Sequence, residues 1–111
     1  MDRRIELVVV QIEADVARAW QTTELAALVN LSASRFRHLF KQEMGVSVGL
    51  YLRELRLDRA ECLLRTTFLA IKEVMTESGM TSTSHFVHYF KARYGLTPTA
   101  YRRRLATFVK H

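Results

Sequence analysis

The chain has 111 residues, of which 49% are hydrophobic and 25% charged, with 4 glycines, 1 proline and a formal net charge of +6. This composition indicates one compact domain or two very small ones, and it excludes a disordered, collagen-like or membrane-spanning chain, since the longest apolar run is only Leu7 to Val10. The lack of a secretory signal pattern and the single cysteine are typical of a soluble cytoplasmic protein.

Apolar residues recur at helical spacing nearly throughout the chain, which predicts an all-α fold of seven helices. The first helix is expected over about residues 4–19 and the second over about 23–29, with Thr22 and Thr23 as caps. The inward stripe of the first helix is Ile5, Val8, Val9, Ile12, Val16 and Trp20. The buried face of the second is Leu25, Leu28 and Val29.

Capping serines and a glycine delimit the next two helices. Ser32 is a good cap for a helix over about 33–43, which Gly45 stops. Ser47 caps a long fourth helix over about 48–65. The inward positions of this long helix are Leu50, Leu57, Ala60 and Leu64.

Three further helices complete the expected order. The fifth is predicted over about 70–77, and the sixth from Thr81 or Ser82 to about residue 93. Thr97-Pro98 begins the seventh, with threonine as the cap and proline at the first helical position.

The sequence also repeats itself. Residues 34–53 align with 84–103 at an offset of 50, with eight identities in twenty positions. Upstream the offset becomes 49, so the turn of the second copy has one extra residue. Such a repeat predicts two helix-turn-helix units, which we place at 1–46 and 67–111 with a linker helix at 47–66. The identical pairs are Ser34/Ser84, Phe36/Phe86, His38/His88, Phe40/Phe90, Lys41/Lys91, Gly45/Gly95, Tyr51/Tyr101 and Arg53/Arg103.

A helix-turn-helix reads DNA with the outward face of its second helix. The predicted outward stripes are Ser34, Arg37, His38 and Lys41 in the first unit, and Ser84, Val87, His88 and Lys91 in the second. Arg37 has the fork that binds guanine, and Val87 can pack on a thymine methyl group. Ordinary solvated charges explain any single residue about equally well, but the duplicated pattern favours DNA contact for each stripe as a group.

The charge distribution is consistent with a polyanion as the ligand. Residues 1–34 carry 3 basic and 5 acidic side chains, whereas residues 91–111 carry 6 basic and none acidic. A basic end suits nucleic acid, or less often an acidic membrane surface. The alternative function is therefore a helical interaction module that binds a protein or an anionic membrane through this end.

Signals for catalysis and for metal binding are weak. His85 and His88 are three residues apart, but no cysteine or carboxylate pair accompanies them, and the other histidines are His38 and His111, so zinc is not expected. Cys62 is on the apolar side of the long helix, which predicts a small core residue rather than a nucleophile. No glycine-rich phosphate loop is present, so we expect neither an enzyme nor a cofactor.

Residues 70–104, AIKEVMTESGMTSTSHFVHYFKARYGLTPTAYRRR, resemble the signature of the AraC/XylS family of bacterial transcription regulators. The matching positions are Ser78-Gly79-Met80, Ser82-x-Ser84-His85-Phe86, Phe90-Lys91, Tyr94-Gly95 and Thr97-Pro98-x-x-Tyr101-Arg102. Met80 departs from the pattern, because the family usually has phenylalanine there. Residues 24–57 are similar to the more variable first half of the family's domain. The resemblance covers about residues 5–105 and implies a seven-helix domain, with two helix-turn-helix units joined by the long helix, that binds promoters sequence-specifically.

The resemblance also implies which residues face DNA. The base-contacting positions it implies are Ser34, Arg37, His38, Thr83, Ser84, Val87 and His88. Phosphate contacts are expected from basic side chains and helix starts, at Ser32, Lys41, Ser82, Lys91, Arg102 and Arg103. A linker helix about 27 Å long suits insertion of both reading helices into adjacent major grooves, which recur every ~34 Å. Because Arg37 and Val87 differ chemically, we expect an asymmetric site.

The expected partners follow from this function. Double-stranded DNA is the main one, which places the protein in the cytoplasm at the nucleoid and not at a membrane. RNA polymerase is a further candidate, with the acidic first helix as the contact surface. The chain is expected to be either a complete small regulator or the C-terminal part of a longer protein with an N-terminal sensor or dimerisation domain.

Overall fold

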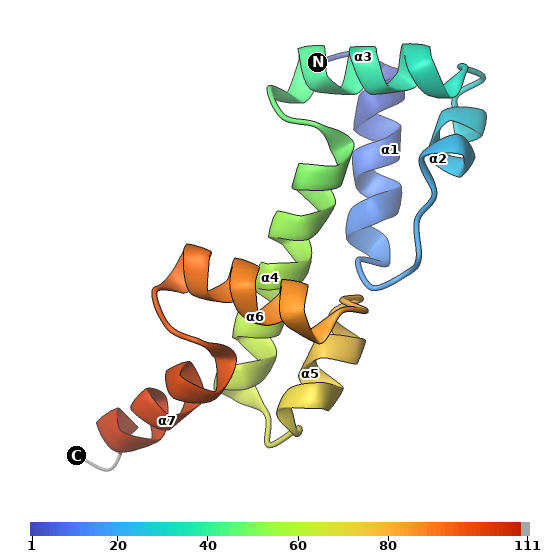
Figure 1. Cartoon of the computed structure of the whole chain (residues 1–111). Coiled ribbons are helices and arrows are strands. Elements are labelled where there is room, and N and C mark those ends of the chain that lie inside the picture. Colours follow the sequence, from blue (N-terminus) through green and yellow to red (C-terminus); the bar gives the residue numbers. More distant parts are fainter. Residues whose placement is uncertain (110–111) are drawn as a thin grey trace. The chain divides into compact units, whose positions relative to one another are not determined.

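A computed structural model describes the backbone of residues 1–109 and the side chains of residues 1–106 (Figure 1). Within that range the chain forms seven α-helices and no strand, which confirms the predicted all-α fold. The helices are α1 (Arg3–Ala14), α2 (Thr22–Leu28), α3 (Ala33–Met44), α4 (Val48–Thr66), α5 (Ile71–Glu77), α6 (Thr83–Tyr94) and α7 (Pro98–Val109). None of these helices is both long and apolar enough to cross a membrane.

The chain divides into two compact units, Met1–Leu55 and Arg56–His111, and the division falls inside α4. Residues 110–111 of the predicted second subdomain, including the terminal histidine, lie outside the described residues. The proposed subdomain limits at residues 46 and 67 stay predictions.

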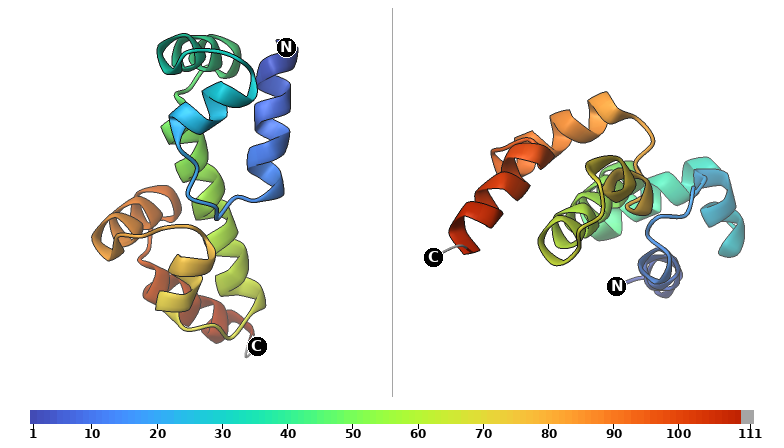
Figure 2. Two further views of the ribbon diagram at one scale, coloured as in Figure 1. Left: turned by 90° about the vertical axis from the view of Figure 1, so that its right-hand side faces the viewer. Right: turned by 90° about the horizontal axis from the view of Figure 1, so that it is seen from below.

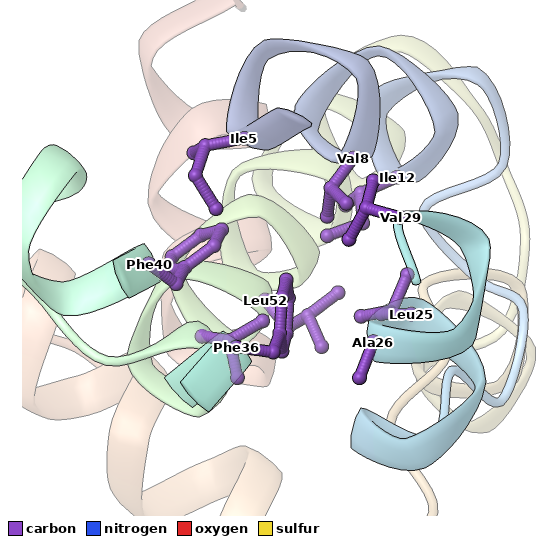
Figure 3. Packing of buried hydrophobic residues seen from close by; sticks show 10 residues of the cluster. Ile5, Val8, Ile12, Leu25, Ala26, Val29, Phe36, Phe40 and Leu52 are labelled. Carbon is purple, nitrogen blue, oxygen red and sulfur yellow. The ribbon is translucent and has the colours of Figure 1, made fainter. Parts of the chain in front are cut away.

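The first unit encloses a core built from α1, α2, α3 and the first part of α4. Figure 3 shows these apolar side chains pointing toward one another from all four helices. Phe36 and Phe40 of α3 are fully buried, with ring centroids 5.8 Å apart. The core residues are Ile5, Val8, Ile12, Leu25, Ala26, Val29, Phe36, Phe40, Val48 and Leu52.

The second unit has its own core, formed by the second part of α4 with α5, α6 and α7. Phe90 of α6 is fully buried and lies against Tyr94 and Tyr101, with ring centroids 4.6 and 5.4 Å away. Tyr101 projects from α7, so these rings join α7 to α6. The buried core residues are Leu57, Ala60, Leu64, Val74, Met75, Phe86 and Phe90.

The repeat extends through both cores, beyond the residues that are identical. The buried pairs at an offset of 50 are Phe36/Phe86, Phe40/Phe90 and Val48/Pro98, and those at 49 are Leu25/Val74, Ala26/Met75 and Val29/Ser78. A further offset of 52 aligns the buried face of α1 with α4, in the pairs Ile5/Leu57, Val8/Ala60 and Ile12/Leu64. The first part of α4 therefore completes the core of the first unit. Its second part packs in the second core as α1 packs in the first.

Several expected helix starts and stops are confirmed. The Ser32 and Ser82 side chains accept hydrogen bonds from backbone N–H groups at the starts of α3 and α6. Gly45 and Gly95 end these helices with φ of 78° and 83°, a left-handed conformation that favours glycine. The Thr97 hydroxyl oxygen accepts a hydrogen bond from the Ala100 amide, 3.2 Å away, at the start of α7.

The end predicted for the first helix and the caps predicted for the second are wrong. The helix α1 ends at Ala14, and Trp20, beyond it, folds back so that its indole N–H donates to the Asp15 carbonyl at 2.8 Å. Trp20 still packs on the core, which is why it fitted the apolar stripe. The cap of α2 is Gln21, without a side-chain hydrogen bond, and both threonines lie inside the helix.

Three expected core positions are also wrong. Leu28 is exposed, Leu50 is only half-buried, and Cys62 is exposed. Each is two residues from a buried position, at Ala26, Val48 and Ala60, and a step of two residues turns an α-helix by about 200°. The other inward residues expected on α2 and α4, such as Leu25, Leu57 and Leu64, are buried, so the error is confined to these three positions on two helices.

A carboxylate at the join of α4 and α7 makes the second unit sensitive to acid. Glu61 Oε2 accepts hydrogen bonds from Arg65 Nε at 3.0 Å and from the Tyr101 hydroxyl at 2.6 Å. The bond from Arg65 lowers the pKa of Glu61 most, burial opposes it, and the bond from Tyr101 lowers it further. A lowered folded-state pKa means that the unfolded chain binds more protons, so this stabilisation is present above the ordinary pKa and is lost as the pH falls through the lowered value.

We therefore expect Glu61→Gln to reduce the free energy of unfolding near neutral pH and to flatten its dependence on pH below about 5, where glutamates begin to bind protons. Urea unfolding followed by circular dichroism at several pH values measures both effects. Glu77→Gln is the matched control, because Glu77 is exposed on α5, and it should keep the wild-type pH dependence. Equal slopes for the two variants would contradict the assignment.

Candidate nucleic-acid interface

The turns that precede α3 and α6 begin with the same backbone geometry, although the second turn is one residue longer. Asn30 adopts a φ of 59° and its equivalent Gly79 a φ of 85°, both in the left-handed region. The next residue, Leu31 or Met80, donates its amide to a carbonyl five residues earlier, at 3.0 Å in both turns. In each unit this turn joins a seven-residue helix to a twelve-residue one. Each unit is therefore a helix-turn-helix.

On α3, burial of two phenylalanines fixes which side chains face outward. Phe36 and Phe40 are one turn apart in the core, so the opposite face of the helix is left to solvent. All four side chains of the predicted outward stripe lie on that face and are exposed: Ser34, Arg37, His38 and Lys41. Ser34 and His38 also line a hollow together with Arg4, Leu31, Arg35, Leu39 and Gln42.

The helix α6 has the same construction, with Phe86 and Phe90 inward. Its predicted outward residues Thr83, Ser84, His88 and Lys91 are exposed, and Val87 is half-buried among them. All five line one shallow, open depression, which Ala92 and Thr97 complete. The structure therefore brings together every base-contacting residue predicted on α6.

Sequence reasoning missed several residues beside these two faces. Gln42 and Ala92 occupy equivalent positions, one helical turn after His38 and His88, so extending the stripes by four residues would have found them. Arg4 comes from α1, and no local pattern in the sequence connects α1 with α3.

The basic side chains on the two outward faces are not neutralised by the protein. Within the described residues Arg37, Lys41 and Lys91 make no ion pair with an acidic side chain. By contrast Arg93, two residues after Lys91, pairs with Asp58 at 2.7 Å. Positive charge on the outward faces is therefore available to an external anion.

Arg102 has a different environment from the one expected of a phosphate contact. It is half-buried, and its guanidinium donates to the carbonyls of Leu64 at 3.3 Å and Thr67 at 3.2 Å, where α4 ends. It also donates to the carbonyls of Leu63 and Leu69. These carbonyls include those that a helix end leaves without partners, so Arg102 caps α4 and fixes the connection to α5. Arg103, the neighbouring candidate, is exposed.

The histidines of α6 form an aromatic group rather than a ligand cluster. The rings of His85 and His88 lie 5.9 and 5.1 Å from the ring of Tyr89. In the part of the chain that the structure describes, no three His, Cys, Asp or Glu side chains gather closely enough to hold a metal ion.

Comparison with known proteins gives a consistent result. Residues 25–104 match a family described as a helix-turn-helix domain. An HTH-type transcriptional regulator of Haemophilus influenzae is 30% identical over 105 residues, which are 95% of this chain and 35% of that protein. The chain thus spans about a third of the length of this relative.

Solved structures with the same fold include DNA-binding domains. A regulator from Chromobacterium violaceum, described as AraC-type, superimposes with a TM-score of 0.81 at 30% identity, covering 94% of this chain and 93% of that one. The DNA-binding domain of AdpA, solved in complex with a target DNA, gives a TM-score of 0.85 at 25% identity over 91% of each chain.

The contacts of Arg102 predict an effect on stability. We expect Arg102→Ala to lower the free energy of unfolding by about 1.5–3 kcal/mol, because several carbonyls at the end of α4 lose a charged donor. Urea unfolding by circular dichroism measures the loss. Arg104→Ala removes an exposed arginine two positions later and should change stability by less than about 0.5 kcal/mol. Similar losses in both variants would exclude the capping role.

Proposed function

This chain belongs to the AraC-type helix-turn-helix family, and we propose that it is the DNA-binding part of a transcription regulator that reads duplex DNA with the outward faces of α3 and α6. The proposal includes no catalytic step and no cofactor. It assigns the basic, unpaired outward faces to the phosphate backbone and to base edges in the major groove.

One observation supports this function above the others. Both units present the same three side chains at equivalent exposed positions of the second helix, as Ser34/Ser84, His38/His88 and Lys41/Lys91. Solubility requires exposed polar residues, but it does not require the same residue types at equivalent positions of both helices. A shared ligand geometry accounts for the match.

Within each face we propose a division of roles. Base edges are contacted by Ser34, Arg37 and His38 in the first unit, and by Thr83, Ser84, Val87 and His88 in the second. Phosphates are contacted by Lys41, Lys91 and Arg103, and by the helix starts at Ser32 and Ser82, where backbone N–H groups and hydroxyl protons can donate. Because Arg102 caps α4, we leave it out of the phosphate contacts.

We further propose that one chain occupies two adjacent major grooves of one duplex. The shared helix α4 has 19 residues and is therefore about 28 Å long, close to the ~34 Å at which one groove recurs. Arg37 and Val87 occupy equivalent positions but suit different bases, so the two contacted segments should differ. Selection of binding sites from random duplexes tests this directly. An inverted repeat, or no enriched sequence, would overturn the proposal.

The curated relatives are much longer than this chain, which supports the presence of a further domain in the functional protein. Relatives that match more than nine-tenths of this chain have only 35% of their own length covered by it. We propose that this unit works together with a sensor or dimerisation domain, and that transcription control involves a contact with RNA polymerase.

The division of roles predicts different behaviour for two basic residues. On a selected site, Arg37→Ala should cost about 1–3 kcal/mol of binding free energy and should relax the preference at one base pair. Lys91→Ala should weaken selected and scrambled DNA alike and reduce the salt dependence of binding. Fluorescence anisotropy titrations on both duplexes at several salt concentrations separate the two patterns, and the same pattern for both variants would contradict the roles.

Val87 allows a sharper test, because its proposed ligand is a single methyl group. Replacing the contacted thymine by uracil removes only that methyl and should weaken wild-type binding about fourfold. In Val87→Ala the same replacement should have little effect, because the methyl has already lost its contact. A double-mutant cycle over the two proteins and two duplexes measures the coupling. Additive losses would exclude the contact.

A further inference from the structure

The outward face of α3 has two sides, and the phosphate contact proposed for its lysine lies on only one of them. Seen along the helix axis, Arg35 and Lys41 lie about 60° to either side of His38, because three residues turn an α-helix by about 300°. A helix that enters the major groove lies between the phosphates of two strands. When Lys41 contacts one strand, the Arg35 side of α3 therefore faces the other.

The hollow beside α3 lies on this Arg35 side. Arg35 and Arg4 of α1 line it together with Ser34, His38, Gln42 and two leucines. Both arginines are exposed, and the described residues that line the hollow include no carboxylate. Arg35 makes no ion pair with an acidic side chain anywhere in the described part of the chain. The hollow can therefore receive an anion.

Hydrogen bonds hold the start of α1 next to α3. Figure 1 and the left view of Figure 2 show the first turn of α1 beside α3 from two directions. The Asp2 amide donates to Glu43 Oε1 in the last turn of α3, at 2.9 Å. The Asp2 carboxylate accepts from the Arg4 amide at 2.8 Å and so caps α1. The backbone of Arg4 is therefore fixed at the hollow, although α1 is not part of the helix-turn-helix.

Asp2 also orients the side chain of Arg4. Its carboxylate oxygens accept from Arg4 Nε at 3.2 Å and from Nη2 at 3.0 Å, so one edge of the guanidinium is occupied. The Nη1 group donates to no other atom of the described residues, which leaves its N–H bonds for a ligand. Asp2 thus offsets the charge of Arg4 and at the same time fixes the direction of its free donors.

Two further acids lie near Arg4, and neither lines the hollow. Glu6 follows Arg4 by two residues, so it projects from α1 about 200° away from it. Glu43 accepts the hydrogen bond from the Asp2 amide. With Asp2 and Arg4 compensating one another, Arg35 leaves the lining of the hollow with a net positive charge.

We propose, on the basis of the DNA reading proposed for α3, that Arg4 and Arg35 together bind one phosphate on the strand opposite to the one that Lys41 contacts. Guanidinium groups suit this ligand, because their N–H donors match the oxygens of a phosphate. The two arginines come from different helices, so the contact extends the DNA interface of the first unit from α3 to α1.

The second unit is built differently at the equivalent positions. Arg56, at an offset of 52 from Arg4, is half-buried, and burial lowers its pKa. His85, at an offset of 50 from Arg35, has its ring 5.9 Å from that of Tyr89. The arginine pair is therefore a feature of the first unit.

Fluorescence anisotropy titrations on a selected DNA site test the contact with two neighbouring arginines. Arg4→Ala should weaken binding about tenfold and reduce the slope of log affinity against log salt by about 0.9. Arg3→Ala is the matched control, because Arg3 is equally exposed on α1 but does not line the hollow. It should change the affinity by less than about twofold. Equal losses in the two variants would overturn the contact.

Loss of Arg4 also leaves Asp2 unpaired, and an unpaired carboxylate repels DNA. Adding Asp2→Asn to Arg4→Ala removes that charge, while asparagine keeps a cap on α1. The double variant should still bind about tenfold more weakly than the wild type, because the donors of Arg4 are missing. A return to wild-type affinity would mean that Arg4 acts only by neutralising Asp2, and would overturn the proposal.

Replacing single phosphates by uncharged methylphosphonates locates the contact. One replacement should weaken wild-type binding and have a smaller effect in both Arg4→Ala and Arg35→Ala. The phosphate whose replacement has a smaller effect in Lys41→Ala should lie on the other strand. Different phosphates for the two arginines, or one strand for all three residues, would overturn the arrangement. A wild type that selects a DNA site while these tests fail would leave the DNA-reading function intact, whereas a wild type without sequence preference would contradict that function itself.

Discussion

The burial of two phenylalanines one turn apart determines what each unit presents to its surroundings. Phe36 and Phe40 hold α3 against the core, and Phe86 and Phe90 do the same for α6. Two buried rings four residues apart fix the rotation of the helix about its own axis, because rotation would expose an aromatic ring at a cost of a few kcal/mol. The polar residues between and beyond the rings are thus held outward at fixed angles, so packing inside the unit determines the orientation of its external face.

Duplication explains the organisation of the whole chain. Two four-helix units normally need eight helices, but residues 1–109 form seven because α4 contributes to both units. The second unit differs from the first where a buried aliphatic residue is replaced by a polar one. Ser78 stands in place of Val29 and donates its hydroxyl to the Val74 carbonyl, and Arg102 stands in place of Leu52 and binds carbonyls at the end of α4. Both replacements satisfy backbone groups instead of adding apolar contact.

The sequence predicted the helix count, the repeat, the family and the outward stripes, because these depend on local signals. Serine caps, glycine stops and four-residue spacing act within a turn or two of the chain, so Ser32 and Gly45 mark α3 without knowledge of the fold. The features that could not be predicted depend on contacts between residues far apart in the sequence. The role of Arg102 depends on carbonyls more than thirty residues away, and the exposure of Cys62 depends on which side of α4 meets the core.

The left-handed residue in each turn has a consequence for how these units can diverge. The first unit has Asn30 at this position and the second has Gly79. Almost every other side chain would clash with its own backbone at such angles, and a β-branched one most of all. Few amino acids can therefore replace Asn30 or Gly79, although neither residue is among the proposed DNA contacts. A restriction of this position to asparagine or glycine in related chains would reflect a torsional requirement of the bend and would not indicate a role in recognition.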